Sequence, residues 1–111
     1  MDTQDLIQYE PLAKEFEGRA SQRGWLFREV KREGLIAMYE KVSVDGSVYF
    51  EVIRVKRDKG GVSVIGGVEI NFESKERYPN DNAFGTDGWC YRGYDRACER
   101  YDELLAVKSS V

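Results

Sequence analysis

The strongest constraint on the fold is the stretch Trp25–Phe72, in which apolar and polar residues alternate and short glycine-containing turns interrupt the pattern. Such alternation is typical of β-strands, because successive side chains of a strand point to opposite faces. The segments Trp25–Arg32 and Leu35–Val42 flank Glu33-Gly34, which predicts a hairpin with a two-residue turn. The first half of the stretch is therefore expected to form two antiparallel strands.

Two further strands are predicted downstream. Asp45-Gly46 is a turn signal, and the segment Ser47–Lys56 after it carries apolar groups on both faces, which favours a place at the centre of the sheet. A polar turn at Lys56–Gly61 precedes the fourth predicted strand, Val62–Phe72, in which Gly66-Gly67 is expected to form a bulge or bend. One face of this strand is expected to be buried, because apolar and polar residues alternate after the glycines.

Helices are predicted at both ends of the chain. Apolar residues recur at helical spacing over Asp5–Gly24, with Pro11 in the first turn and Gly24 as a C-terminal cap. A second periodic segment, Tyr94–Leu105, predicts a closing amphipathic helix. The expected fold class is α+β: a single domain over residues 1–111, with an antiparallel meander of about four strands flanked by an N-terminal and a C-terminal helix, in the order α-β-β-β-β-α.

The segment before the closing helix combines turn-forming residues with aromatic ones. Residues 78–88 are rich in Pro, Asn, Asp and Gly and are expected to form an irregular loop over the sheet. Phe84, Trp89 and Tyr91 are expected to fold back onto the sheet, with Gly85 and Gly88 allowing the chain to reverse. This packing role accounts for the aromatic residues without a ligand.

Charge and cysteine content bear on the compartment and on the partners. The chain has 17 basic and 20 acidic side chains, a net charge of −3, which disfavours general attraction to nucleic acid or to anionic lipid. The acidic start Met1–Asp5 is unlike a secretory signal, and no apolar run reaches the roughly 18 residues that span a bilayer. A cytoplasmic location is therefore expected, with Cys90 and Cys98 as reduced thiols.

The chain contains no histidine, which excludes a Ser-His-Asp triad, a Cys-His dyad and a histidine-based zinc site. Two cysteines cannot complete a tetrahedral zinc site in one chain, and the glycine pairs match neither a P-loop nor a dinucleotide-binding turn. No metal and no cofactor are expected.

An enzyme would have to use carboxylates or Cys90, the more reactive of the two thiols, since Cys98 falls on the apolar stripe of the closing helix. No pair of carboxylates has a spacing that requires a catalytic arrangement. The carboxylates considered are Asp81, Asp87, Asp95, Asp102 and Glu103. We interpret most of them as turn formers and solvated charges, which leaves Asp81, Asp87 and Cys90 as the residues of a possible small enzyme.

A nucleic-acid-binding module is another alternative. Arg54, Lys56, Arg57 and Lys59 cluster at the end of one predicted strand, where they would contact phosphates. A second basic group, Arg28, Lys31 and Arg32, would project from a nearby strand. The acidic overall charge and the lack of a concentrated basic stripe argue against this alternative.

Two segments carry a resemblance to known proteins. They are YFEVIRVK (Tyr49–Lys56) and YPNDNAFGTDGWCYRGYDRACERYDEL (Tyr78–Leu104), with a shared pattern of Tyr78-Pro79, Phe84-Gly85, Gly88-Trp89, Tyr91, Ala97 and Glu103-Leu104. In this pattern the chain resembles small proteins encoded by bacteriophages, prophages and related mobile elements. The resemblance implies neither an activity nor catalytic residues, and residues 1–46 lie outside it.

The main hypothesis from the sequence is a non-enzymatic binding protein of phage or mobile-element origin. Such a protein would inhibit a host defence protein or nucleoprotein by occupying its surface. The expected contact surface is acidic and consists of Asp95, Glu99, Asp102 and Glu103 on the last helix with Glu10 and Glu17 on the first. Self-association through a sheet edge, at Trp25–Arg32 or Val62–Phe72, is a further possibility that would give a homodimer.

Overall fold

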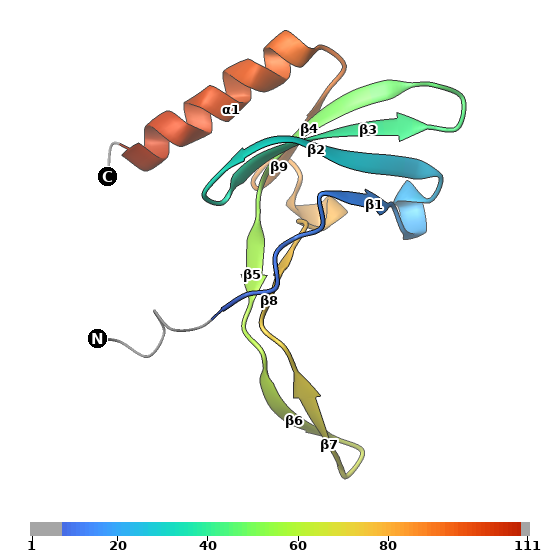
Figure 1. Cartoon of the computed structure of the whole chain (residues 1–111), viewed down its shortest axis with the longest axis vertical. Coiled ribbons are helices and arrows are strands. Elements are labelled where there is room, and N and C mark those ends of the chain that lie inside the picture. Colours follow the sequence, from blue (N-terminus) through green and yellow to red (C-terminus); the bar gives the residue numbers. More distant parts are fainter. Residues whose placement is uncertain (1–7, 110–111) are drawn as a thin grey trace.

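The computed structural model describes residues 8–109, which form a β-rich structure with one α-helix (Figure 1). The strands are β1 (Glu15–Glu17), β2 (Trp25–Glu33), β3 (Ile36–Ser43), β4 (Val48–Arg54), β5 (Lys56–Asp58), β6 (Gly61–Ile65), β7 (Val68–Phe72), β8 (Lys75–Arg77) and β9 (Gly88–Tyr91). Two short 3-10 helices are η2 (Ala20–Gln22) and η3 (Asp81–Ala83), and the α-helix is α1 (Tyr94–Ser109). In the described part of the chain, no helix is long and apolar enough to cross a membrane.

The predicted order α-β-β-β-β-α is wrong. The strands of residues 8–109 form a five-stranded sheet, β1-β2-β3-β4-β9, and two separate two-stranded ribbons, β5-β8 and β6-β7. The paired strands run antiparallel throughout. The described residues therefore contain one α-helix, at the C-terminal end, instead of a meander flanked by two helices.

The helix predicted over Asp5–Gly24 is absent from the described residues of that segment, and its first residues, 5–7, lie outside them. The segment instead lies along the edge of β2 as β1, and Phe16 stacks on Phe27 with ring centroids 4.8 Å apart. Two backbone hydrogen bonds hold the β1 segment to this edge: Gly18 N–H donates to Trp25 O, and Glu29 N–H donates to Lys14 O. The strand is favoured because it partly buries Phe16 and also satisfies the backbone groups of an otherwise open edge.

The two predicted hairpins are confirmed, with small changes. Glu33 pairs with Ile36, so the first turn is Gly34-Leu35, one residue later than predicted. The second hairpin closes at Asp45-Gly46, where the Asp45 carboxylate accepts a hydrogen bond from Ser47 N–H at 2.9 Å. These turns follow local chemistry, which a sequence shows directly.

The centre of the large sheet is β3 and not β4, the strand expected there. Ala37, Met38 and Tyr39 on β3 are fully buried, and β3 lies between β2 and β4. The β4 strand is also internal, because β9 covers its other edge. The fifth strand, β9, begins at the last residue of the predicted loop.

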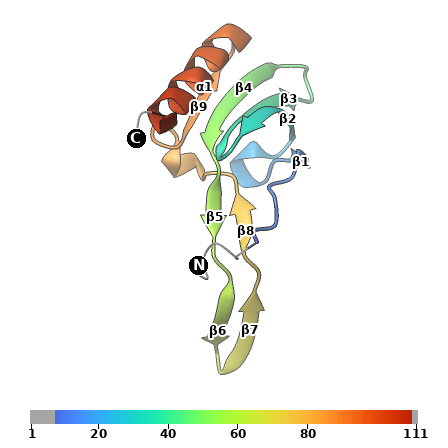
Figure 2. The same ribbon diagram turned by 60° about the vertical axis from the view of Figure 1, so that its left-hand side comes forward.

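The fourth predicted strand, Val62–Phe72, is a hairpin of its own. Gly66 and Gly67 have φ angles of 59° and 79° and form the turn between β6 and β7. Two consecutive left-handed residues reverse the chain, whereas a bulge would only bend it. The hairpin extends away from the rest of the molecule (Figures 1 and 2), and all its strand residues are exposed, so the predicted burial of one face is wrong.

The two faces of the large sheet are covered differently. Helix α1 covers one face, and the β1 segment lies on the other (Figure 2). Residues buried beneath α1 are Ile36, Met38, Val52, Ala97, Tyr101 and Leu104, with Trp89, Tyr91 and Cys98 packed against them. The second core comprises Phe27, Ala37, Tyr39, Ile53 and Val55, with Leu12, Phe16, Tyr78 and Phe84 against it. The closing helix and the packing roles of Phe84, Trp89, Tyr91 and Cys98 are thereby confirmed.

Candidate binding cleft

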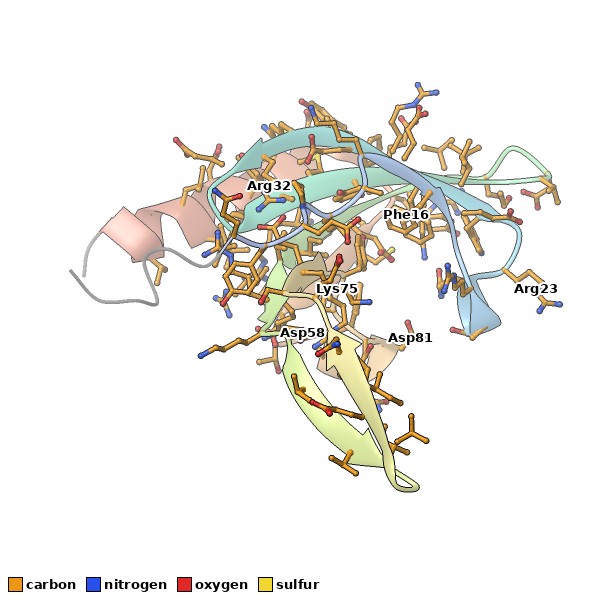
Figure 3. All side chains as sticks on the ribbon, turned by 60° about the horizontal axis from the view of Figure 1, so that its bottom comes forward. Phe16, Arg23, Arg32, Asp58, Lys75 and Asp81 are labelled. Atoms are coloured by element: carbon orange, nitrogen blue, oxygen red, sulfur yellow. The ribbon has the colours of Figure 1, made fainter. Side chains whose placement is uncertain are left out.

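A cleft of about 740 Å³ opens on the face of the sheet opposite α1. One wall is the segment that contains β1 and η2, and the other runs from β8 to η3. Figure 3 views this face, with Phe16 on the first wall and Lys75 and Asp81 on the second. The lining residues on the two walls are residues 12–13, 16–22, 75–82 and Phe84, and the floor is formed by Phe27 and Glu51.

The two walls are held together at both ends. Near one end, the Glu76 carboxylate accepts a hydrogen bond from Leu12 N–H at 3.0 Å. Near the other, the Ser21 hydroxyl donates to the Asp81 carboxylate. A Cβ atom on Gly18 would lie 2.2 Å from Gln22 O, so the tight bend before η2 requires glycine. The cleft is thus bounded by segments that lie about sixty residues apart in the sequence.

Aromatic rings from the floor and from both walls form an apolar cluster in the cleft. The Phe16 and Phe27 rings are stacked, with an interplanar angle of 7°. Tyr78 stands edge-on to both, with centroid distances of 5.6 and 5.5 Å, and edge-on to Tyr39 at 5.3 Å. Edge-to-face contacts of this kind add to the apolar area that the rings bury and hold them in place.

Glu51 of this floor belongs to a buried ion pair. Lys41 on β3 and Glu51 on β4 are 8% and 4% exposed, and Lys41 Nζ lies 3.0 Å from Glu51 Oε2. The second carboxylate oxygen accepts a hydrogen bond from the Tyr78 hydroxyl at 2.7 Å, and Lys41 also donates to Gln22 Oε1 at 2.9 Å. Burial, and then the charge of Glu51, raise the pKa of Tyr78 well above its ordinary value, which keeps the hydroxyl protonated as a donor.

Sequence reasoning did not single out the residues of this cluster. A signal was present, because Lys41 follows Tyr39 by two residues on β3, and Glu51 precedes Ile53 by two on β4. Residues two apart on a strand share a face, so each charge occupies a position where an apolar residue is expected. Two such positions on paired strands, with opposite charges, indicate a buried ion pair.

Cys90 lies opposite Glu51 in the β4–β9 register, so a carboxylate lies beside the thiol. The residue is exposed, but its thiol faces the carboxylate. Partial desolvation, followed by the negative charge of Glu51, raises the pKa of the Cys90 thiol. The reactive form of cysteine is the thiolate, so this environment disfavours nucleophilic chemistry at neutral pH.

The two loop carboxylates considered for catalysis, Asp81 and Asp87, are engaged by a hydrogen-bond donor and by cations, respectively. Asp87 Oδ2 lies 2.6 Å from Lys56 Nζ, and Asp87 Oδ1 lies 3.7 Å from Arg54 Nη1. The hydrogen bond from Lys56, with the charges of both cations, lowers the pKa of Asp87. Asp81 lines the cleft and accepts the Ser21 hydrogen bond. The structure does not bring Asp81, Asp87 and Cys90 together in one pocket, because Asp87 and Cys90 do not line the cleft.

Most of the basic residues considered for nucleic-acid binding are paired with carboxylates. Arg54 and Lys56 contact Asp87, and Arg57 Nε lies 3.6 Å from Glu76 Oε2. The second basic group is engaged too: Arg28 pairs with Glu15, Arg32 pairs with Glu76, and Lys31 lies 4.6 Å from the centroid of the Tyr101 ring under α1. These contacts reduce the positive charge available to phosphates.

The six acidic residues of the predicted contact surface fall on two sides of the molecule. Asp95, Glu99, Asp102 and Glu103 are exposed on α1, where Glu103 pairs with Arg100 at 3.2 Å. Glu10 and Glu17 are exposed on the segment that covers the opposite face, and Glu17 lines the cleft. The residues on α1 therefore form one candidate surface, and Glu17 belongs to another.

Comparison of the chain with protein-family models, with curated proteins and with solved structures returned no match. Within residues 8–109, no group of three or more His, Cys, Asp or Glu side chains is placed to hold a metal ion. The candidate site therefore rests on the geometry of the cleft.

Backbone strain occurs at one wall of this cleft. Ala20, in η2, has a φ angle of 52°, in the left-handed region that favours glycine. The Ala20→Gly variant is expected to raise the free energy of unfolding by up to about 1 kcal/mol. The relief of strain, about 1–2 kcal/mol, exceeds the stability that is lost because glycine gives the unfolded chain more conformational freedom. Chemical denaturation measures the change. The control Ala106→Gly, on the exposed face of α1, should destabilise by up to about 1 kcal/mol, and an equal loss at Ala20 would contradict the assigned strain.

Proposed function

We propose that this protein binds another protein and that the cleft between the β1–η2 wall and the β8–η3 wall receives an apolar side chain from an extended segment of the partner. The observation that carries the proposal is the aromatic cluster of Phe16, Phe27 and Tyr78 in the cleft, on a face that α1 leaves uncovered. A volume of about 740 Å³ falls within the range of binding pockets. Aromatic floors with a polar rim are typical of recognition sites.

The polar groups of the cleft support binding over catalysis. Glu51 is occupied by Lys41 and Tyr78, and Asp81 by Ser21. Among the described residues, no buried side-chain nitrogen or oxygen lacks a hydrogen-bond partner. A catalytic acid or base needs access to its substrate, and these groups are engaged within the protein. An enzyme using Asp81, Asp87 or Cys90 is accordingly the less supported alternative.

For the partner, we keep the hypothesis drawn from the sequence, in which the chain resembles phage and mobile-element proteins. We propose a host protein or nucleoprotein, bound in the cytoplasm, whose action the protein inhibits by occupying its surface. The exposed acidic residues of α1 offer a second contact surface that suits a basic partner.

A selection from a random peptide library on the immobilised protein tests the cleft. We expect the selected peptides to share an apolar anchor residue. Asn82→Trp and Ala13→Trp place an indole on opposite walls, and each should weaken a selected peptide at least about tenfold, or by about 1.4 kcal/mol. Isothermal titration calorimetry measures the affinities.

Two controls locate the binding surface. Val44→Trp adds an indole to the β3–β4 turn, where Val44 is 94% exposed, and should leave the affinity unchanged. Charge reversal at Asp102 and Glu103 on α1 should also leave it unchanged if the cleft is the site. Loss of binding on this reversal, with full binding by the cleft variants, would refute the cleft and move the contact surface to α1.

A further inference from the structure

The hairpin β6–β7 is an arm whose apolar side chains meet solvent. Each residue of β6 has a direct partner on β7, and the pairs Ile65–Val68, Ser63–Ile70 and Gly61–Phe72 share one face. The other face carries Val62 and Val64 on β6, opposite Asn71 and Glu69 on β7. Exposed fractions of the apolar residues range from 36% for Ile70 to 71% for Val64. An isolated two-stranded ribbon of this kind is only marginally stable in water, and a further strand would stabilise it.

The free edge of β6 lacks the features that normally prevent pairing. Within residues 8–109, β6 is bonded to β7 alone, so its other edge is open. The strand Gly61–Ile65 contains no charged residue and no proline. Exposed edges in natural sheets are usually protected by charges, proline or bulges, and an unprotected edge is a template for another strand.

The direction of the open backbone groups follows from the turn. In a hairpin with a two-residue turn the closing pair, here Ile65 and Val68, exchanges hydrogen bonds, and bonded pairs alternate with non-bonded ones. Ser63 and Ile70 then form the next bonded pair. The N–H and C=O groups of Val62 and Val64 therefore point away from β7, to the open edge.

We propose that two copies of this chain associate through their β6 edges, antiparallel and about a two-fold axis at Ser63, to form one four-stranded sheet. In this register the backbone of Val62 in one copy exchanges hydrogen bonds with the backbone of Val64 in its partner, so that all the outward N–H and C=O groups of Val62 and Val64 are paired. The four valines lie side by side on one face, and β-branched cross-strand pairs of this kind are favourable. The edge is self-complementary, as a two-fold interface requires.

The distribution of charge favours the β6 edge over the β7 edge as the dimer interface. The arm, residues 60–74, carries two carboxylates, Glu69 and Glu73, and no basic residue. Pairing through β7 would bring Glu69 of the two copies onto neighbouring strands, where like charges repel. Pairing through β6 places both copies of Glu69 on the outer strands. A second β6 edge therefore meets this edge without charge repulsion and in a register that pairs its outward groups, and the inference is independent of the cleft.

Proline scanning of the arm, read by analytical ultracentrifugation, tests the dimer. The unmodified protein is expected to sediment as a dimer at high concentration and to dissociate on dilution. Val64→Pro removes an N–H that points to the open β6 edge and leaves the β6–β7 bonds intact, so this variant should remain monomeric. The matched control Asn71→Pro removes the equivalent N–H from the outer edge of β7 and should still dimerise.

A cysteine at the proposed axis gives a second measurement. Ser63→Cys, in a background with Cys90→Ser and Cys98→Ser, should form a disulfide-linked dimer on mild oxidation, because a non-bonded antiparallel pair places its Cβ atoms within disulfide range. Ile65→Cys in the same background lies opposite Gly61 of the partner and should not. A monomer at every concentration up to the solubility limit overturns the proposal, as does a dimer lost in Asn71→Pro and kept in Val64→Pro. Circular dichroism confirms that the compared variants are folded.

Discussion

Replacing Lys41 with methionine is expected to lower the free energy of unfolding by about 3–5 kcal/mol, because it leaves the Glu51 carboxylate buried without its counter-charge. Glu51 is 4% exposed, and Lys41 Nζ lies 3.0 Å from it. The Tyr78 hydroxyl still donates to the carboxylate, but a neutral donor does not replace a cation. Denaturant unfolding followed by tryptophan fluorescence measures the loss.

Two further variants distinguish the effect of breaking the ion pair from the effect of removing any lysine. Lys59→Met removes an exposed lysine and should change stability by less than about 0.5 kcal/mol. The double variant Lys41→Met with Glu51→Leu removes both charges and should recover much of the loss, since apolar residues often replace a buried pair without cost. A loss below about 1 kcal/mol for Lys41→Met would mean that Glu51 is hydrated in the folded state.

Glu76→Gln is expected to lower the free energy of unfolding at neutral pH by about 3 kcal/mol and to remove much of the acid sensitivity of the protein. Arg32 binds both oxygens of Glu76, with Nη1–Oε1 and Nη2–Oε2 distances of 2.7 and 2.6 Å. The hydrogen bond from Arg32, helped by Leu12 N–H and the charge of Arg57, lowers the pKa of Glu76 from 4.5 to about 2. The Glu76 side chain is only 6% exposed, so solvent screens this interaction weakly.

The sign of the pH dependence follows from the depressed pKa. The unfolded chain takes up a proton at Glu76 near pH 4.5, whereas the folded protein resists protonation down to about pH 2. The stabilisation is therefore complete above pH 4.5 and is lost as the pH falls through this interval to about 2. Denaturant unfolding at a series of pH values should show a shallower decline for Glu76→Gln than for the unmodified protein.

Glu15→Gln is the matched control for Glu76. The Arg28–Glu15 pair has a similar distance, 3.0 Å, but both side chains are 63% exposed. Exposed ion pairs contribute about 0–1 kcal/mol, so the control should have little effect on stability or on its pH dependence. Equal effects of the two substitutions would contradict the assignment of the acid-sensitive group to Glu76.

Local signals were read correctly where neighbouring residues determine the outcome. The hairpin turn at Asp45-Gly46 and the closing helix from Tyr94 depend on turn chemistry and on a repeated apolar spacing, and both formed as predicted. The Gly66-Gly67 pair predicts an interruption of the strand, but the neighbouring residues in the sequence do not distinguish a bulge from a chain reversal. The φ angles of 59° and 79° make it a turn, which releases β6 and β7 from the main sheet.

The candidate site was harder to predict, because its parts come from distant segments. Asp81 was considered from its own residue type, but its partner Ser21 lies sixty residues away. The ion pair of Lys41 and Glu51 and the ring of Tyr78 likewise meet only when β3, β4 and the segment after β8 are assembled. No local pattern reports such contacts.

The sequence by itself determined the strands of residues 25–54, the turns between them and the C-terminal helix, since alternation, helical spacing and turn residues act over a few positions. Only the tertiary structure decided the state of the segment around Phe16. Its apolar spacing suits a helix, but the open edge of β2 offers backbone hydrogen bonds and a stacking partner in Phe27, and these outweigh a weak local preference. The choice of strand over helix there also creates the wall of the cleft, so the candidate site depends on a long-range contact.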